Sequence, residues 1–210
     1  MIVKKMPILQ WFPDFETVKK LTKKHAFSEH FVPVFYDIET TGLSRNSTFL
    51  YLVGAVAYEE KNWQMYQWMI EDEKEEPELL KIFSEFLQNF SCTIQYNGDS
   101  FDQPYLEARY QIHGLPSPFE SLPSLDLYRQ LKPVKGLLKL SKMNLPSVEA
   151  FLGIDQRDYC DGAACIRHYK QFASGKKKEA ADIVLGHNQE DLLGLGKILS
   201  MLSYLCLFEE

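Results

Sequence analysis

Residues 34–43 read VFYDIETTGL, an apolar run that ends in two acids and a glycine-containing break. Side chains two positions apart on a strand point to the same face of a sheet, so Asp37 and Glu39 would lie side by side. Two carboxylates this close repel each other unless a proton or a cation lies between them. A divalent metal ion is the usual solution in oxygen-rich sites. Two solvated acids at a strand end would give the same pattern, and the spacing recurs at Asp14 and Glu16 without a preceding strand.

The composition is that of a globular protein. A chain of 210 residues with 45% hydrophobic residues is long enough to bury a substantial core. Four cysteines without a C-x-x-C pair favour reduced thiols over zinc ligands. The beginning of the chain does not resemble a secretory signal, and Lys197 interrupts the longest apolar run near the C-terminus. We therefore expect a cytoplasmic protein without a membrane span.

The order of predicted elements indicates an α/β fold. Strands are expected at 32–39, 49–58, 63–70, 92–96 and 122–127. Helices are expected at 77–90, 102–112, 145–152, 162–172 and 180–207, with a short helix at 14–25.

A second motif, YNGDSFD at residues 96–102, follows a predicted strand. Asn97 and Gly98 are typical of a turn, Asp102 opens the next helix, and Phe101 lies beside it. An Asp at this point is also a common helix N-cap, which is the structural alternative for Asp102.

A third motif, HNQED at residues 187–191, lies in the last predicted helix. Positions i and i+4 share a helix face, so His187 and Asp191 would point toward one place. A surface pair is the alternative, although the leucines that follow favour burial nearby.

In this order the three motifs resemble the DEDD 3′–5′ exonuclease superfamily of ribonuclease-H-like folds and, more closely, its YprB-type branch. The similarity extends from about residue 31 to residue 207. The resemblance implies a ribonuclease-H-like mixed five-stranded sheet flanked by helices over residues 31–210, after an N-terminal extension of residues 1–30. The YprB-type branch also shares the extra residue between Asn97 and Phe101, and a histidine four positions before the last acid.

The resemblance also implies roles for individual residues. Metal ligands are expected at Asp37, Glu39, Asp102 and Asp191, and the general base at His187. Contacts to the substrate are expected from Thr40, Thr41, Leu43, Asn97 and Phe101.

The residue types fit this chemistry. Four carboxylates could hold two divalent cations about 3.5–4 Å apart, which would stabilise the attacking and leaving oxygens at phosphorus. An all-oxygen set favours magnesium or manganese. A histidine with an ordinary pKa of about 6.5 accepts a proton from water near neutral pH. Asp126, at the end of a predicted strand, is expected to cap the following helix.

The net charge of −6 does not favour nucleic-acid binding, but the charge is uneven. Residues 127–148 contain basic side chains and no acid. These include Lys135, Lys139 and Lys142, which form either a solvated face or a surface that follows phosphates.

The sequence therefore favours a metal-dependent 3′–5′ exonuclease acting on single-stranded DNA or RNA ends. One alternative is a nucleic-acid-binding module with weak or no activity, which a missing acid would have favoured. The other is a phosphodiesterase for short oligonucleotides, which would differ in how its groove is closed.

Overall fold

The computed structural model describes residues 1–22, 31–153, 160–175 and 177–206. The strands are β1 (Ile2–Pro7), β2 (Pro33–Thr40), β3 (Leu50–Glu59), β4 (Asn62–Met69), β5 (Cys92–Gln95) and β6 (Ser124–Asp126). The α-helices are α1 (Phe15–Thr22), α2 (Glu76–Leu87), α3 (Asp102–Ile112), α4 (Leu127–Leu131), α5 (Leu145–Phe151), α6 (Gly162–Gly175) and α7 (Lys178–Cys206). Short 3-10 turns span η2 (Glu73–Glu75), η3 (Pro118–Ser121) and η4 (Lys132–Val134).

The strands form one mixed sheet in the order β1-β4-β3-β2-β5-β6. The pairs β1–β4, β4–β3 and β3–β2 are antiparallel, whereas β2–β5 and β5–β6 are parallel. The predicted α/β class and mixed sheet are confirmed, but the sheet has six strands instead of five. The additional strand is β1, from the segment predicted to be an extension.

Strand β1 pairs along its whole length with β4, from Ile2 opposite Met69 to Pro7 opposite Gln64. Its residues alternate between half-buried and exposed, as expected for an edge strand with one covered face. The helix predicted over 14–25 is present as α1, which begins one residue after Asp14. The ends predicted for this helix and for the last helix, His25 and Leu207, lie outside the described residues.

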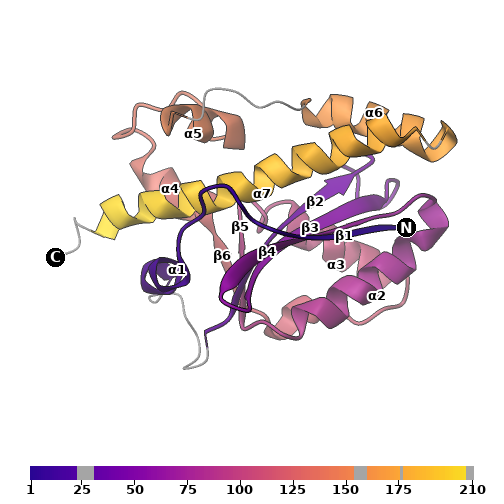
Figure 1. Ribbon diagram of the computed structural model, residues 1–210, viewed down its shortest axis with the longest axis horizontal. Helices are drawn as coiled ribbons and strands as arrows, with labels where there is room; N and C mark the ends of the chain where they lie inside the picture. Colours follow the sequence, from indigo (N-terminus) through magenta and orange to yellow (C-terminus); the bar gives the residue numbers. More distant parts are fainter. Residues whose placement is uncertain (23–30, 154–159, 176, 207–210) are drawn as a thin grey trace.

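Helices cover both faces of the sheet (Figure 1). Tyr36 of β2 packs against Phe83 of α2, with 5.6 Å between ring centroids. The neighbouring Phe35 belongs to a separate core cluster that includes Leu192 and Ile198 of α7. Alternate residues of β2 therefore face opposite helical layers, as the period of a strand requires.

The long helix α7 lies along the sheet (Figure 1). Its buried apolar residues include Val184, Leu192 and Ile198. Over the part of the chain that the structure describes, no helix is both long and apolar enough to cross a bilayer. Of the described cysteines, Cys92, Cys160 and Cys165 are free thiols.

Candidate active site

Asp37 and Glu39 lie at the end of β2, opposite Gly54 and Leu52 of β3. The pairing register shifts between Glu39 and Thr40, so the strand is irregular immediately after the two acids. Both acids are on the face of β2 that α7 covers, whereas Ile38 is buried in the core on the opposite face. The predicted placement of this pair is therefore what the structure shows.

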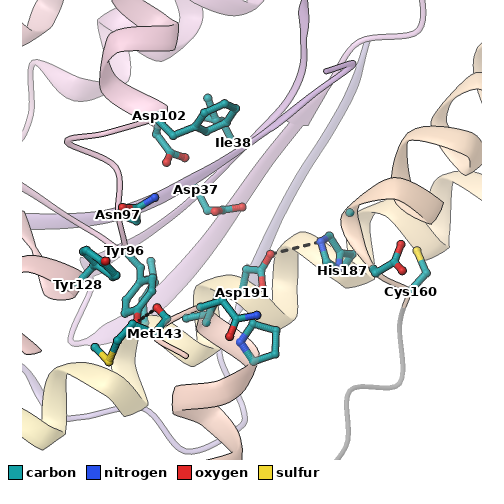
Figure 2. A pocket seen from close by; sticks show the side chains of 17 residues that line it. Asp37, Ile38, Tyr96, Asn97, Asp102, Tyr128, Met143, Cys160, His187 and Asp191 are labelled. Carbon is teal, nitrogen blue, oxygen red and sulfur yellow. Dashed lines mark hydrogen bonds and ion pairs between the residues drawn. The ribbon is translucent and has the colours of Figure 1, made fainter. Parts of the chain in front are cut away.

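His187 and Asp191 come from one face of α7. His187 Nε2 lies 3.4 Å from Asp191 Oδ2 (Figure 2) and also 3.4 Å from Glu39 Oε1. His187 and both carboxylates are buried. The i, i+4 spacing thus places the imidazole between an acid of the helix and an acid of the strand, so the alternative of a surface pair is wrong.

Asp102 is the first residue of α3. Its carboxylate approaches the other acids from the edge of β2 that pairs with β5. Pairing of β2 with β5 ends at Phe35, so the rest of this strand edge is open to the start of α3. Burial raises the pKa of Asp102 to about 7, although the backbone amides of Asp102 and Ile38 oppose the shift by hydrogen-bonding the carboxylate. The amide of Ile38 thus links Asp102 to the strand between the other two acids. Phe101, not Asp102, occupies the N-cap position.

The acids converge strongly enough to affect one another. One carboxylate oxygen each from Asp37, Glu39 and Asp191 lies within 4.8 Å of the others. Burial, and then the charges of Asp191, Asp102 and Glu39, raise the pKa of Asp37 well above its usual range. Oxygens bound to one Mg²⁺ are separated by about 3–4 Å. The arrangement therefore fits a divalent cation, which would remove this repulsion. Asp14 instead caps α1 by accepting hydrogen bonds from Thr17.

Asn188, which belongs to the third motif but was not among the predicted site residues, holds Asp37 in place. Asn188 is fully buried on α7, and its Nδ2 donates to Asp37 Oδ2 over 2.9 Å. Its Oδ1 accepts from Gln67 Nε2 over 2.9 Å. Gly54 leaves the space for this contact, since a Cβ there would lie 2.0 Å from Asn188 Oδ1. The sequence shows Gly54 within the predicted strand 49–58, but only the pairing register reveals that it lies opposite Asp37.

Tyr51 supports Glu39 from β3. Its buried hydroxyl donates to Glu39 Oε2 over 3.4 Å. Because Glu39 Oε1 faces His187, the two oxygens of this carboxylate have different neighbours. This fixes the orientation of the carboxylate at the end of β2.

A cavity of about 780 Å³ opens next to the acids. Asp37, Asp102, His187 and Asp191 line it together with Asn97, Phe101 and two tyrosines, Tyr96 and Tyr128 (Figure 2). The Tyr96 hydroxyl donates to the carbonyl of Met143 over 2.6 Å, and its ring meets Tyr128 edge-on at 5.8 Å between centroids. Neither tyrosine was among the predicted site residues.

The other predicted substrate contacts are more dispersed. Thr40 is buried and donates to the carbonyl of Gly42 over 2.9 Å, and Thr41 Oγ1 donates to the carbonyl of Phe49 over 3.4 Å. The side chain of Leu43 is 85% exposed just beyond the end of β2. None of these three is among the described residues that line the cavity.

The predicted lysines also lie outside the cavity. Lys139 and Lys142 are exposed and Lys135 is half-buried, in the segment leading to Met143 and Asn144, which do line it. Asp126 caps α4 as expected, by accepting from the amide of Tyr128 over 2.9 Å. It also accepts from the amide of Asn97 over 2.8 Å, which steadies the turn of the second motif.

Comparison with known proteins agrees with this geometry. Over 167 residues the chain is 26% identical to protein YprB of Bacillus subtilis, covering 77% of this chain and 39% of that protein. A stretch of 46 residues, 22% of this chain and 3% of the relative, is 48% identical to a DNA polymerase of Methanocaldococcus jannaschii. The chain thus spans well under half the length of these relatives.

Among solved structures, the fold resembles the family B DNA polymerase of the archaeon Pyrobaculum calidifontis. The TM-score is 0.66 with 14% identity, over 84% of this chain and 25% of the polymerase. The model of the family described as RNase_H superfamily matches residues 34–203, a range that contains nearly all of β2 and α7 and every acid of the site. With its mixed sheet and nuclease fold, the chain belongs to the RNase_H superfamily.

Proposed function

We propose that this protein is a metal-dependent 3′–5′ exonuclease that hydrolyses phosphodiester bonds at the ends of single-stranded DNA or RNA. The observation that carries the proposal is the convergence of Asp37, Glu39 and Asp191 within 4.8 Å beside His187. These residues come from a strand and a helix far apart in the sequence. Asp37, His187 and Asp191 line the cavity that would receive a strand end.

In this proposal Asp37, Glu39, Asp102 and Asp191 hold two divalent cations, magnesium or manganese. When bound, these ions would stabilise negative charge on the attacking and leaving oxygens at phosphorus. The protein's contribution is to hold the carboxylates before the ions arrive. Asn188 and Tyr51 do this by hydrogen-bonding Asp37 and Glu39.

His187 would accept the proton of the attacking water through Nε2. That nitrogen faces both Glu39 and Asp191, each at 3.4 Å, and the two carboxylates would stabilise the imidazolium that forms. Asp191 would thereby serve both the cation and the base. The order of positions on α7 sets this arrangement.

The cavity supports a single strand as substrate. Tyr96, Tyr128 and Phe101 offer aromatic surfaces beside the acids, and unpaired bases stack on such surfaces without sequence preference. Both archaeal matches are DNA polymerases, which supports nucleic acid as the substrate. Thr40, Thr41, Leu43 and Asn97 would contact the terminal nucleotide, and Lys135, Lys139 and Lys142 the phosphates farther along. A cytoplasmic location is part of the proposal.

The test is digestion of single strands of DNA and RNA labelled at the 5′ end, with and without manganese. We expect a ladder that shortens from the 3′ end, only when the metal is present. Asp37→Ala should abolish this cleavage. Asp14→Ala should not, because Asp14 belongs to a D-x-E pair with the same spacing that lies away from the site. Binding without cleavage by the unaltered protein would instead indicate a nucleic-acid-binding module. Cleavage restricted to strands of a few nucleotides would indicate a short-oligonucleotide phosphodiesterase.

A further inference from the structure

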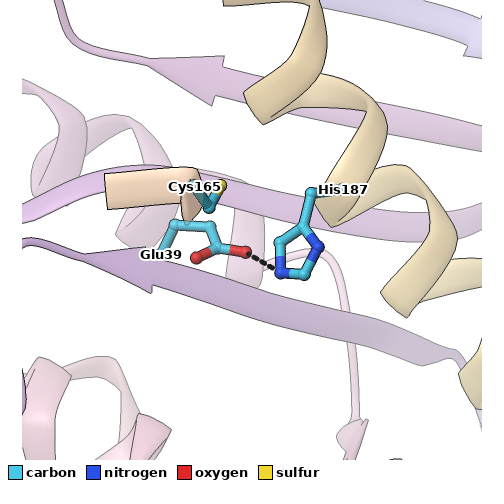
Figure 3. A group of neighbouring side chains, drawn as sticks. All are labelled: Glu39, Cys165 and His187. Atoms are coloured by element: carbon cyan, nitrogen blue, oxygen red, sulfur yellow. Dashed lines mark ion pairs between the residues drawn. The ribbon is translucent and has the colours of Figure 1, made fainter. Parts of the chain in front are cut away.

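A second group of metal-ligating side chains shares residues with the proposed catalytic site. Glu39, Cys165 and His187 each present one ligand atom, and these atoms all lie within 4.8 Å of one another (Figure 3). All three residues are buried. They come from the end of β2, the first turn of α6 and the middle of α7, so only the folded chain brings them together.

A second thiol lies beside this group. Cys160, two residues before α6, borders the main cavity. The Cys160 side chain is a free, half-buried thiol that neighbours Cys165. The Tyr51 hydroxyl joins the group from the other side, at 3.6 Å from Cys165 Sγ and 3.4 Å from Glu39 Oε2. One sulfur, one imidazole and one carboxylate thus gather at one point, and the second sulfur, of Cys160, lies next to Cys165 outside this group of three.

This ligand set differs in kind from the set of acids next to it. Magnesium and manganese prefer oxygen, whereas zinc prefers thiolate and imidazole in a tetrahedral arrangement. Two ligand atoms about 2.1 Å from zinc at the tetrahedral angle are about 3.4 Å apart. His187 Nε2 and Glu39 Oε1 are 3.4 Å apart, so this edge of the tetrahedron is already in place.

We propose that Glu39, Cys165 and His187, with Cys160 as the fourth ligand, form a thiolate site for zinc that switches the nuclease off. Zinc binding would release the thiol protons to solvent. It would also engage the carboxylate of Glu39 and the imidazole of His187, which catalysis requires. The binding half of the proposal stands on the ligand set alone, whereas the inhibitory half rests on the proposed nuclease function.

The binding test uses cobalt as a spectroscopic substitute for zinc in chelator-treated protein. Thiolate bound to cobalt gives a charge-transfer absorption in the near ultraviolet, which an all-oxygen site does not give. We expect this band with one equivalent of cobalt, and its loss when zinc is added. Cys165→Ser should weaken cobalt and zinc binding at least tenfold. Cys92→Ser is the matched control, because Cys92 is a buried thiol in the other core cluster.

Thermal melts would show whether Cys165→Ser folds, and Cys160→Ser offers a second variant at a less buried position. Absence of the thiolate band in the unaltered protein would overturn the proposal. An unchanged band in folded Cys165→Ser, or in Cys160→Ser for the fourth ligand, would overturn that part of the assignment.

The activity test measures zinc inhibition in excess magnesium, with each variant compared with its own zinc-free rate. The zinc concentration that halves the rate should rise at least tenfold in Cys165→Ser and stay unchanged in Cys92→Ser. A thiolate band in a protein without nuclease activity would support the metal site and refute the proposed function. A thiolate band with zinc-insensitive cleavage would refute the inhibitory half alone.

Discussion

Replacing Asp102 by Asn tests whether the acids of the site destabilise the folded protein in the absence of metal. Asp102 is buried, and its pKa rises from 3.8 to about 7 in the folded protein. Between these values the folded state holds a proton that the unfolded state has lost, so the free energy of unfolding must fall as pH rises through this interval. Three pH units correspond to an upper limit of about 4 kcal/mol.

Asn is nearly isosteric with the protonated acid and does not ionise. At about pH 4 the two proteins should therefore have similar stability, and above about pH 7 Asp102→Asn should be more stable by up to about 4 kcal/mol. The gain should include relief at Asp37, whose pKa Asp102 also raises. Magnesium should reduce the difference, because it stabilises the unaltered site by mass action.

The assay is urea unfolding in chelator across this pH range, repeated with magnesium. Asp14→Asn is the control with the opposite sign. Hydrogen bonds from Thr17 lower the pKa of Asp14 in the folded protein, so its contribution to stability is present at neutral pH and is lost as pH falls through that lowered value. A stability difference between Asp102→Asn and the unaltered protein that does not change with pH would refute the reasoning.

Three further changes separate the roles within the site. His187→Ala should lower turnover about a hundredfold or more with little effect on substrate affinity, as loss of a general base does; a loss of affinity at unchanged rate would show that His187 is not the base. Gly54→Ala should cost about 1–3 kcal/mol in urea unfolding, because the new Cβ would lie 2.0 Å from Asn188 Oδ1; a neutral effect would mean that α7 does not need this close approach. Changing Lys135, Lys139 and Lys142 together to Gln should weaken binding and flatten its salt dependence in a fluorescence titration, with saturated turnover kept; an unchanged salt slope would make these lysines an ordinary solvated face.

The sequence by itself determined the elements that carry the chemistry. Apolar runs with local periodicity locate β2, β3, β4 and α7 to within a few residues, because each pattern is a property of one short segment. The spacing of Asp37 and Glu39 on a strand, and of His187 and Asp191 on a helix, follows from the same local geometry. The two pairs therefore point toward each other from β2 and α7, as expected.

Only the tertiary structure decided how distant segments combine. Strand β1 has a mixed, half-exposed pattern, and its pairing with β4 joins residues 57 to 67 positions apart, which no local pattern specifies. The contact of Asn188 with Asp37 depends on Gly54 lying opposite that acid in the sheet register. The group of Cys165, Glu39 and His187 has no recognisable metal-binding spacing, because its three residues come from a strand and two helices. Local sequence fixes which way a side chain points within its own element, but the packing of elements decides what it meets there.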